Sequence, residues 1–138
     1  MISSHEGINL PINNIKKGAN FTYIEPVNIY DCEVLDNVFV GPFVEIQKNV
    51  KIGSNTRIQS HAFICSDVVI GNDCFISHGV MFVNDTFSNG KVNFTPPFMK
   101  TNIGNNVLIG SNATVLPVSI VDDVIIGAGS VVTKDISE

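Results

Sequence analysis

Residues 40–82 read VGPFVEIQKNVKIGSNTRIQSHAFICSDVVIGNDCFISHGVMF and carry a strict six-residue repeat. A large apolar residue stands at every sixth position, and a small or β-branched residue follows it four positions later. A period of six fits neither the 3.6-residue α-helix nor a hairpin meander, so each unit is expected to form one short strand and one turn. The large residues are Val40, Ile46, Ile52, Ile58, Ile64, Ile70, Ile76 and Phe82, and the smaller ones are Val44, Val50, Thr56, Ala62, Val68, Cys74 and Val80.

The same period extends in both directions from this stretch. Three units predict a triangular coil of about 18 residues, and such coils stack into parallel sheets around an apolar axis. Gly, Asn and Asp at the corners tolerate the positive φ that such turns often need. We therefore predict an all-β parallel β-helix, with a β-sandwich of coincidental spacing as the alternative. Further repeat positions are Val34, Val38, Ile103, Ile109, Val115, Ile120, Ile126 and Val132.

Composition favours strands and narrows the function classes. The 138 residues include 18 Ile and 18 Val but only 4 Leu and 4 Ala, and β-branched residues suit strands better than helices. This length predicts a single domain spanning residues 1–138. The net charge of −5 and the lack of a Lys/Arg stripe argue against a nucleic-acid partner.

The sequence gives no sign of membrane insertion or secretion. No apolar run approaches the roughly 18 residues of a membrane helix, and the N-terminal MISSHEGINLP lacks the pattern of a secretory signal. Three cysteines occur without a CxxC pair. This usage indicates reduced thiols in a cytoplasmic protein rather than a disulfide framework or a zinc site.

Two segments depart from the regular repeat. Residues 83–102, VNDTFSNGKVNFTPPFMKTN, hold three Phe and a Pro-Pro pair, and long segments of this kind in a compact domain are usually functional or disordered. We predict a protruding binding loop, with packing against a neighbouring subunit as the alternative. Residues 1–33 are expected to form an irregular first coil or part of a nucleotide pocket. A one-residue slip at Pro117 predicts a tightened corner.

Large apolar residues also stand outside the core columns. Exposed apolar residues in this number suggest a surface that packs on a partner, and a cyclic oligomer is a natural closure for a three-sided rod. These residues are Phe39, Phe43, Phe63, Phe75, Met81 and Leu108.

The hexad column, IGNDCFISHGVMFVND at 70–85 and the IGSNATVLP and VIIGAGSVVTKDI segments within 109–136 resemble hexapeptide-repeat acyltransferases. Within that family, GPFVEIQKNVKIG (41–53) and HGVMFVND (78–85) are most similar to N-acetyltransferases of nucleotide-linked 3-amino sugars. The resemblance covers residues 34–136 and implies a left-handed β-helix that forms a homotrimer with active sites between subunits. Family members continue beyond VVTKDI, so the chain is expected to be a piece of a longer protein, one half of a fused enzyme or a short natural form.

The family activity implied by this resemblance is acetyl transfer from acetyl-CoA, without a metal, to an amino sugar carried on dTDP or UDP. The expected acceptor is a 3-amino-3,6-dideoxyhexose used in surface-polysaccharide biosynthesis. Another small acceptor is the alternative. A positioned base accelerates such a reaction, and alignment of the two substrates lowers the barrier further.

Three residues near the start of the loop are the catalytic candidates. His78 is the candidate base, although the leaving thiolate takes the proton in some relatives. Asn84 can accept a hydrogen bond from the amine, and Asp85 can orient the sugar. The structural alternatives are a turn hydrogen bond for His78 and Asx-turn caps for Asn84 and Asp85.

The remaining candidates would bind the two substrates. Main-chain N–H groups at Gly110 and Ser111 could serve as oxyanion donors. Gly127 and Ala128 are small enough for the cofactor arm to lie against them, and Lys134 is a candidate phosphate partner for CoA. Because both substrates are anionic and the chain is acidic, binding must depend on local charge. The candidates for contact with the sugar nucleotide are Arg57, Gln59, His61, Glu45 and Gln47.

Two rival functions share this fold. A zinc enzyme of the carbonic anhydrase type needs three converging histidines; His61 and His78 lie about one coil apart, whereas His5 lies in the N-terminal region. A structural or assembly protein would use the coil without catalysis, but the twenty-residue loop argues against that role.

Overall fold

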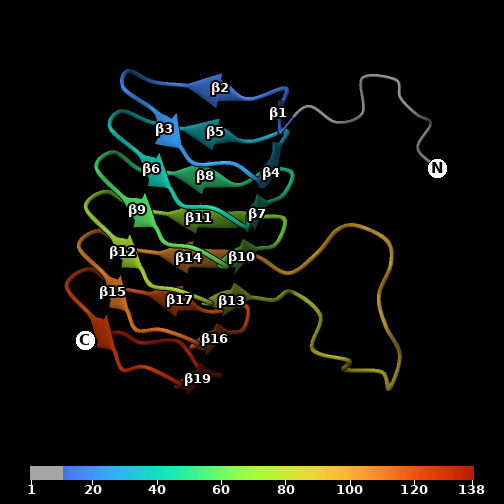
Figure 1. Cartoon of the computed structure of the whole chain (residues 1–138). Coiled ribbons are helices and arrows are strands. Elements are labelled where there is room, and N and C mark those ends of the chain that lie inside the picture. Colours follow the sequence, from blue (N-terminus) through green and yellow to red (C-terminus); the bar gives the residue numbers. More distant parts are fainter. Residues whose placement is uncertain (1–10) are drawn as a thin grey trace.

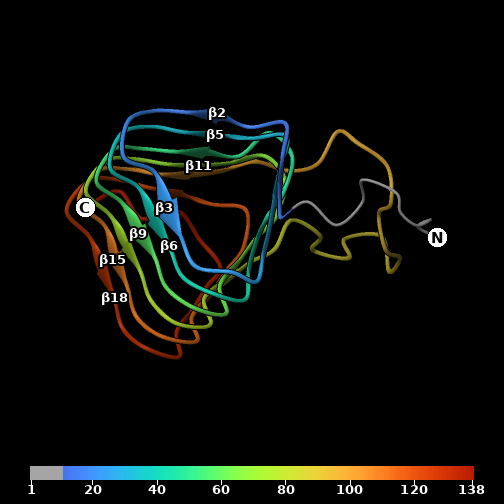
Figure 2. The ribbon, with the colours of Figure 1, turned by 45° about the horizontal axis from the view of Figure 1, so that its top comes forward.

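The computed structural model describes residues 11–138 and confirms a left-handed parallel β-helix of about seven turns. Each turn contributes one strand to each of three parallel sheets, here called faces A, B and C, and the stacked turns form a triangular prism (Figures 1 and 2). The prism has three edges, which we name A–B, B–C and C–A after the faces that meet there.

The strands are short and repeat in the same order in every turn. Face A contains β1 (Ile12–Asn13), β4 (Val27–Tyr30), β7 (Val44–Ile46), β10 (Phe63–Ile64), β13 (Met81–Phe82), β16 (Thr114–Val115) and β19 (Val131–Val132). Face B contains β2 (Lys16–Lys17), β5 (Glu33–Val34), β8 (Lys51–Ile52), β11 (Val68–Ile70), β14 (Thr101–Ile103) and β17 (Ser119–Ile120). Face C contains β3 (Thr22–Tyr23), β6 (Phe39–Val40), β9 (Arg57–Ile58), β12 (Phe75–Ile76), β15 (Leu108–Ile109) and β18 (Ile125–Ile126).

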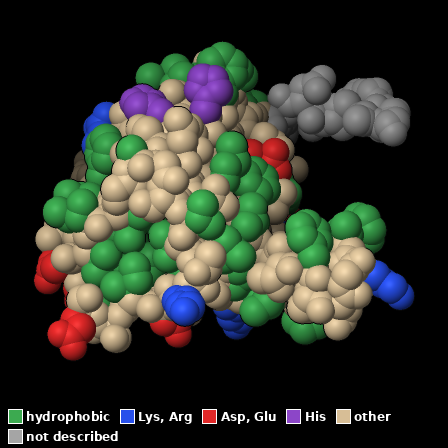
Figure 3. All heavy atoms as spheres, turned by 90° about the horizontal axis from the view of Figure 1, so that it is seen from below, with side chains coloured by type: hydrophobic (Ala, Val, Ile, Leu, Met, Phe, Trp, Pro, Cys, Tyr) green, Lys and Arg blue, Asp and Glu red, His purple; other side chains and the backbone are tan. Residues whose placement is uncertain are grey.

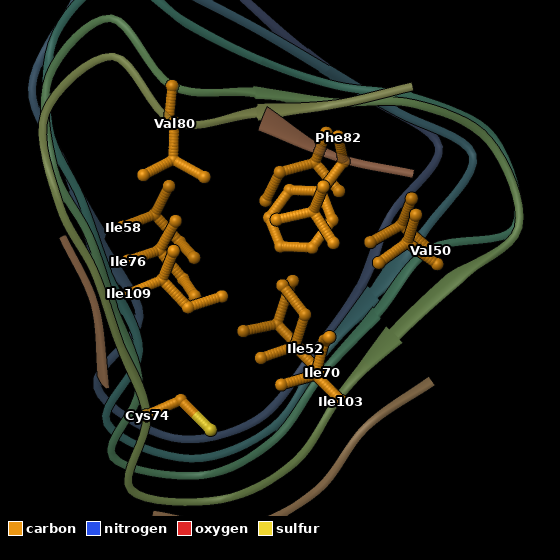
Figure 4. Packing of buried hydrophobic residues seen from close by; sticks show 14 of the residues in the cluster. Val50, Ile52, Ile58, Ile70, Cys74, Ile76, Val80, Phe82, Ile103 and Ile109 are labelled. Atoms are coloured by element: carbon orange, nitrogen blue, oxygen red, sulfur yellow. The ribbon is translucent and has the colours of Figure 1, made fainter. Parts of the chain in front are cut away.

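The large residues of the hexad fill the axis of the prism, as predicted. Ile58, Ile76 and Ile109 point inward from face C and stack in successive coils, while Ile52 and Ile70 do the same from face B (Figure 4). All five side chains are buried. Burial of this apolar area contributes roughly 25 cal/mol per Å² to the stability of the coil, so the repeat itself supplies the core.

The N-terminal part of the described chain is more regular than predicted. In residues 11–33, Ile12 pairs with Ile29, and Lys16 pairs with Glu33, in register with the coils below. The expectation of an irregular first coil is therefore wrong for these residues. The sequence pattern did not show that this coil is regular, because β2 carries lysines and its pairing depends on backbone hydrogen bonds. Residues 1–10 lie outside the described part.

The predicted loop leaves the coil at the A–B edge between β13 and β14 and projects away from the prism (Figure 1). Ile64 and Ile70 are six residues apart, but Phe82 and Ile103 in the next coil are twenty-one apart. Thr101 and Asn102, which were expected in the loop, belong to β14. Among the described residues, no helix has the length and apolar character needed to cross a membrane.

Candidate active site

The C–A edge is a column of corner turns that present their side chains to solvent. In four successive coils, the N–H of the third turn residue donates to the carbonyl of the second turn residue in the coil above, at 2.8–3.1 Å. The third turn residue has a positive φ in these four coils and also in the coil above them. These residues are Phe43 (64°), His61 (68°), Gly79 (71°), Asn112 (62°) and Gly129 (73°).

More than half of the predicted site residues gather on this edge, although they come from four different coils. Figure 3 shows histidine side chains at the upper edge of the molecule, with apolar side chains on the face below them and the loop projecting at the lower right. The sequence-predicted residues at the C–A turns are Gln59, His61, His78, Gly110, Ser111, Gly127 and Ala128.

His78 is an exposed side chain held by its neighbour in the coil above. Its Nδ1 atom lies 2.9 Å from the Ser60 hydroxyl. When Nδ1 donates to that hydroxyl, the Nε2 lone pair is free to accept a proton, which is the requirement for a general base. Ser60 was not predicted as a site residue, although the predicted 18-residue coil places position 60 directly above position 78.

Phe43 and His61 form an exposed aromatic stack at the top of the C–A column. Their ring centroids are 4.9 Å apart with an interplanar angle of 28°, and Phe43 is 57% exposed. A left-handed backbone costs a bulky residue roughly 1–2 kcal/mol, while an aromatic pair contributes about 0.5–1.5 kcal/mol. The stack therefore does not offset the strain of two such residues.

The oxyanion prediction needs a correction at Gly110. Its N–H donates to the carbonyl of Ile126 at 2.8 Å, as part of the bonding between coils. This amide is therefore not available to a ligand, and the expected donor role of Gly110 is wrong. A Cβ atom added at Gly127, in the last described coil, would meet only the Ser130 hydroxyl, at 3.7 Å, whereas one added at Gly110 in the coil above would lie 2.5 Å from the Ala128 nitrogen.

Asn84 and Asp85 lie on the other side of face A, at the A–B edge. Asn84 Nδ2 donates to the Ser66 carbonyl at 3.4 Å, which leaves its Oδ1 as an acceptor. Asp85 accepts from the backbone N–H groups of Phe87 at 2.9 Å and Asn93 at 2.6 Å. Both carboxylate oxygens of Asp85 thus accept backbone hydrogen bonds from the loop, which is the capping role given as the structural alternative for this residue.

The Asn84 position is linked to the middle of face A by a polar chain. The Ser66 N–H donates to Gln47 Oε1 at 3.2 Å, and Gln47 Nε2 donates to Glu45 Oε2 at 2.8 Å. Beside this chain, the loop folds back on the edge around a cavity of about 270 Å³. Its lining residues are Lys48, Asn49, Ser66, Asp67, Phe94, Pro96 and Phe98.

The remaining predicted residues are dispersed. Arg57 lies on the outer side of face C with its guanidinium 4.2 Å from the centre of the Phe39 ring. Lys134 is exposed in the last coil and lines a surface hollow with Asp135. The Oε1 atom of Gln59 is buried without a hydrogen-bond partner among the described residues. The structure thus brings neither Arg57 nor Lys134 next to His78.

The buried cysteines are poor nucleophiles and do not form part of a metal centre. Burial raises the pKa of Cys65 to about 12 and that of Cys32 to about 11, because a thiolate loses its hydration inside the coil. Within residues 11–138, no group of three or more His, Cys, Asp or Glu side chains is placed to hold a metal ion. His5, the third histidine of the zinc hypothesis, lies outside those residues.

Two family profiles match this chain. The bacterial transferase hexapeptide (six repeats) matches residues 31–66 and 49–84, and the hexapeptide repeat of succinyl-transferase matches residues 100–134. Together these matches cover more than half of the chain, and the observed coil has the architecture that the repeat predicts. The chain belongs to the hexapeptide-repeat transferase family.

Individual relatives match either a short part of this chain at high sequence identity or most of it at low sequence identity. The bifunctional protein GlmU of Campylobacter curvus is 60% identical over 38 residues, which are 27% of this chain and 9% of that protein. GlmU of Streptococcus gordonii is 53% identical over 38 residues, 27% of this chain and 8% of that protein. The chain therefore corresponds to less than a tenth of the length of these curated relatives.

Among solved structures, the chain is similar to a mutant of AntD, an N-acyltransferase from Bacillus cereus in complex with dTDP and coenzyme A. The TM-score is 0.66 at 19% identity, and the match covers 95% of this chain and 77% of that chain. At this identity the likeness supports the fold.

Proposed function

We propose that this protein transfers an acetyl group from acetyl-CoA to the amine of a sugar linked to dTDP or UDP. The observation that carries the proposal is the column of candidate binding and catalytic residues along the C–A edge of a hexapeptide-repeat transferase coil. The AntD complex with dTDP and coenzyme A supports the same substrate classes for this architecture. The proposed acceptor is a 3-amino-3,6-dideoxyhexose carrier, which fits a role in surface-polysaccharide biosynthesis.

The reaction requires a neutral amine next to the thioester. The amine nitrogen attacks the carbonyl carbon, the carbon–sulfur bond breaks, and the proton passes to His78 Nε2 or to the leaving thiolate. Asn84 Oδ1 accepts a hydrogen bond from the amine and keeps its lone pair directed at the carbonyl. Asp85 acts through the loop that it braces, so we assign it a positioning role.

His78 and Asn84 belong to opposite edges of face A, with β13 between them. The chain makes six steps from His78 to Asn84, through the corner at Gly79 and through β13, and six extended steps would span at most roughly 20 Å. We take the two corners to be too far apart for both side chains to contact one amine. A complete site therefore needs the C–A edge of one copy and the loop edge of another. This requirement supports a homotrimer with sites between subunits.

The outer surfaces of faces A and C support the same assembly. Both faces flank the C–A edge and carry columns of large apolar side chains, while the outer column of face B is mostly polar. Apolar surface of this extent usually marks an interface. The apolar members are Phe39, Phe75, Leu108 and Ile125 on face C, with Arg57 between the two phenylalanines, and Phe63, Met81 and Val131 on face A, with Thr114 between Met81 and Val131.

The donor would lie along the lower coils. The open surface at Gly127 and Ala128 admits a linear pantetheine arm, and the Ser111 N–H is the remaining candidate for polarising the thioester carbonyl. Lys134 lies in the last coil, where a basic side chain can meet a phosphate of CoA. Because the chain carries a net charge of −5, these local contacts must attract both anionic substrates.

A panel assay tests the proposed function. Free-thiol release from acetyl-CoA is measured with several nucleotide-linked amino sugars, and the matching 3-hydroxy sugars are the controls. We expect activity on at least one 3-amino-3,6-dideoxyhexose carrier and none on the hydroxy controls. Inertness across the panel in a folded trimeric sample would reject the assignment, and turnover only with amines that lack a nucleotide would favour another small acceptor.

A further inference from the structure

The upper part of the C–A edge carries a feature that acetyl transfer does not need. Phe43 and His61 adopt positive φ values in two successive coils, whereas the same column carries Gly79, Asn112 and Gly129 further down. Glycine and asparagine tolerate this conformation, but bulky side chains are strained in it. Strain of this kind persists mainly where the side chain has a function.

The strained pair presents an aromatic surface to solvent. The two rings are stacked with centroids 4.9 Å apart, and more than half of the Phe43 surface is exposed. Aromatic side chains held in this way bind planar ligands such as nucleobases by stacking, because every base has a π-face. A ring that served only the core would be covered by apolar neighbours.

A cleft next to Phe43 supplies both apolar and polar walls. Its volume is about 370 Å³, and it lies on the outer side of face A between the second and third coils. Gln47 Nε2 donates to Oε2 of Glu45, which fixes the carboxylate and leaves Oε1 as a further acceptor. The lining residues are Pro26, Val27, Asn28, Phe43, Val44 and Glu45.

We propose that the Phe43–His61 stack and this cleft bind the base of the nucleotide that carries the acceptor sugar. This inference rests on the proposed function and adds the location and the class of the base. The Glu45 carboxylate accepts a hydrogen bond from a ring N–H, which uracil, thymine and guanine have and which cytosine and adenine lack. The Phe43–His61 stack and the cleft, together called the platform, therefore select nucleotides with a ring N–H.

The position of the platform fits the way in which the base, diphosphate and sugar of the acceptor would lie along the C–A edge. Phe43 stands two coils above Gly79, the neighbour of His78, and coils are about 4.8 Å apart. A base at Phe43 would leave its diphosphate and sugar directed down the edge toward His78. The acceptor then approaches from the upper coils, and the pantetheine arm approaches from the lower ones.

Binding of free nucleotides to the full chain tests this placement without relying on turnover. Calorimetric titration with UDP, dTDP and GDP is compared with CDP and ADP, for the parent and for Phe43→Asn and Phe43→Tyr. Asparagine is the residue that this column already uses at position 112, so Phe43→Asn keeps the backbone conformation and removes the ring. We expect about tenfold or greater loss of affinity in Phe43→Asn, from the known strength of base–aromatic stacking. Phe43→Tyr should bind as the parent does, and the melting temperature of Phe43→Asn should not fall.

The outcomes separate this inference from the proposed function. Tight UDP, dTDP or GDP binding that Phe43→Asn leaves intact, or equal affinity for CDP and ADP, would overturn the platform and leave the acetyltransferase assignment standing. If Phe43→Asn changes the oligomeric state in light scattering but not the affinity, the ring packs on a second copy and the platform is rejected. If the parent binds none of the nucleotides, the nucleotide-linked acceptor is rejected together with the platform.

Discussion

The B–C and C–A edges of the prism share one backbone and differ in their side chains. On the B–C edge, the Asn55 N–H donates to the Asp36 carbonyl at 2.9 Å, and on the C–A edge the Gly79 N–H donates to the Ser60 carbonyl at 3.0 Å. Every positive-φ residue of the B–C edge is Asn or Asp, whereas the C–A edge uses Phe, His, Gly and Asn. The B–C residues are Asn20, Asn37, Asn55, Asp73, Asn106 and Asp123.

The side chains of the B–C edge satisfy one another. Asn37 Nδ2 donates to Asn55 at 3.1 Å, and Asn55 Nδ2 donates to Asp73 at 3.1 Å, so the ladder closes the edge with groups that need no ligand. The C–A edge has no matching ladder among the described residues. Since the backbone makes the same demand on both edges, we attribute the variation on the C–A edge to the ligand contacts proposed above rather than to folding.

The largest expected effect is the difference in stability between a glycine-to-alanine substitution at the B–C edge and one at the C–A edge. A Cβ atom added at Gly71, at the start of a B–C corner, would lie 2.5 Å from the Gly104 carbonyl oxygen. We expect Gly71→Ala to lower the free energy of unfolding by about 3 kcal/mol or more, since the coils cannot separate. Gly127→Ala, on the C–A edge, should change it by less than about 0.5 kcal/mol.

Urea unfolding of the two alanine variants measures this difference. In the acetyl-CoA assay, Gly127→Ala should raise KM for the donor while leaving the melting temperature unchanged. Equal destabilisation by both substitutions would show that the last C–A corner is not open at Gly127, and the proposed place for the cofactor arm would be lost. A Cβ atom at Gly110, one coil above on the same edge, would lie 2.5 Å from the Ala128 nitrogen, so the difference concerns the last corner and not the whole edge.

The second effect concerns the A–B edge, where the loop begins. Asn84→Ala removes the acceptor proposed to direct the amine, so turnover should fall about 100-fold, a loss typical of a group that contacts the reacting atoms. The melting temperature should change little, because Asn84 makes one long hydrogen bond of 3.4 Å. Unchanged turnover in Asn84→Ala would remove this residue from the site.

Mixed oligomers test whether the C–A edge of one copy and the A–B edge of another copy form one site. His78→Ala and Asn84→Ala chains are expressed together and compared with each variant alone. If a site takes His78 from one copy and Asn84 from another, the mixture contains some intact sites and recovers part of the parental turnover. A mixture no more active than the separate variants would contradict sites shared between copies.

The third effect separates the ladder from backbone preference. Asn55→Ala and Asn112→Ala both place alanine at a positive φ, but only Asn55 takes part in the side-chain ladder. We expect Asn55→Ala to cost about 2 kcal/mol and Asn112→Ala about 1 kcal/mol, the difference being the net value of the lost hydrogen bonds. Thermal unfolding of both variants checks this, and a larger cost for Asn112→Ala would reverse the roles of the two edges.

The smallest expected effect concerns the buried Cys65 thiol at the A–B edge. Burial raises the pKa of Cys65 to about 12 from 9.0, so the folded state keeps the neutral thiol. The stability from this group is complete below about pH 9 and is lost as the pH rises toward 12. Between pH 8 and pH 9.5 the parent should lose about 1 kcal/mol more than Cys65→Val, because one pKa unit corresponds to about 1.4 kcal/mol.

Urea titrations at both pH values give this difference. Valine is the matched control, since Val83 occupies the same position in the next coil. Identical pH dependence in the parent and in Cys65→Val would mean that the A–B edge admits water to the thiol.

The core could be predicted from the sequence because it depends on one local rule. A large aliphatic residue at every sixth position has one way to avoid water, and Ile58, Ile76 and Ile109 are buried as the period requires. The regularity of the first coil was not predicted because β2 consists of Lys16 and Lys17, whose place in the sheet depends on backbone pairing. Backbone hydrogen bonding between strands cannot be recognised from the spacing of apolar residues.

The site was harder to predict because it depends on relations between coils. His78 and Asn84 were predicted as one catalytic group because they are close in sequence, but the six residues from one to the other make up one side of the coil, and β13 places them at different edges. Hydrogen bonds between coils also decided which amides are free, as the Gly110 N–H shows. The aromatic residue Phe43 was noticeable in the sequence as an apolar residue outside the core, but its conformation and its stack on His61 are visible only in the fold.

Hydrogen exchange at single-amide resolution, with and without coenzyme A and dTDP, tests most directly whether the C–A edge is where ligands bind. We predict slower exchange at the turns 41–43, 59–61, 77–79 and 127–129 when the ligands are present. Amides of the B–C ladder around Asn37, Asn55 and Asn106 should exchange at unchanged rates. Protection confined to the B–C edge, or no protection on the C–A edge at saturating ligand, would contradict the account.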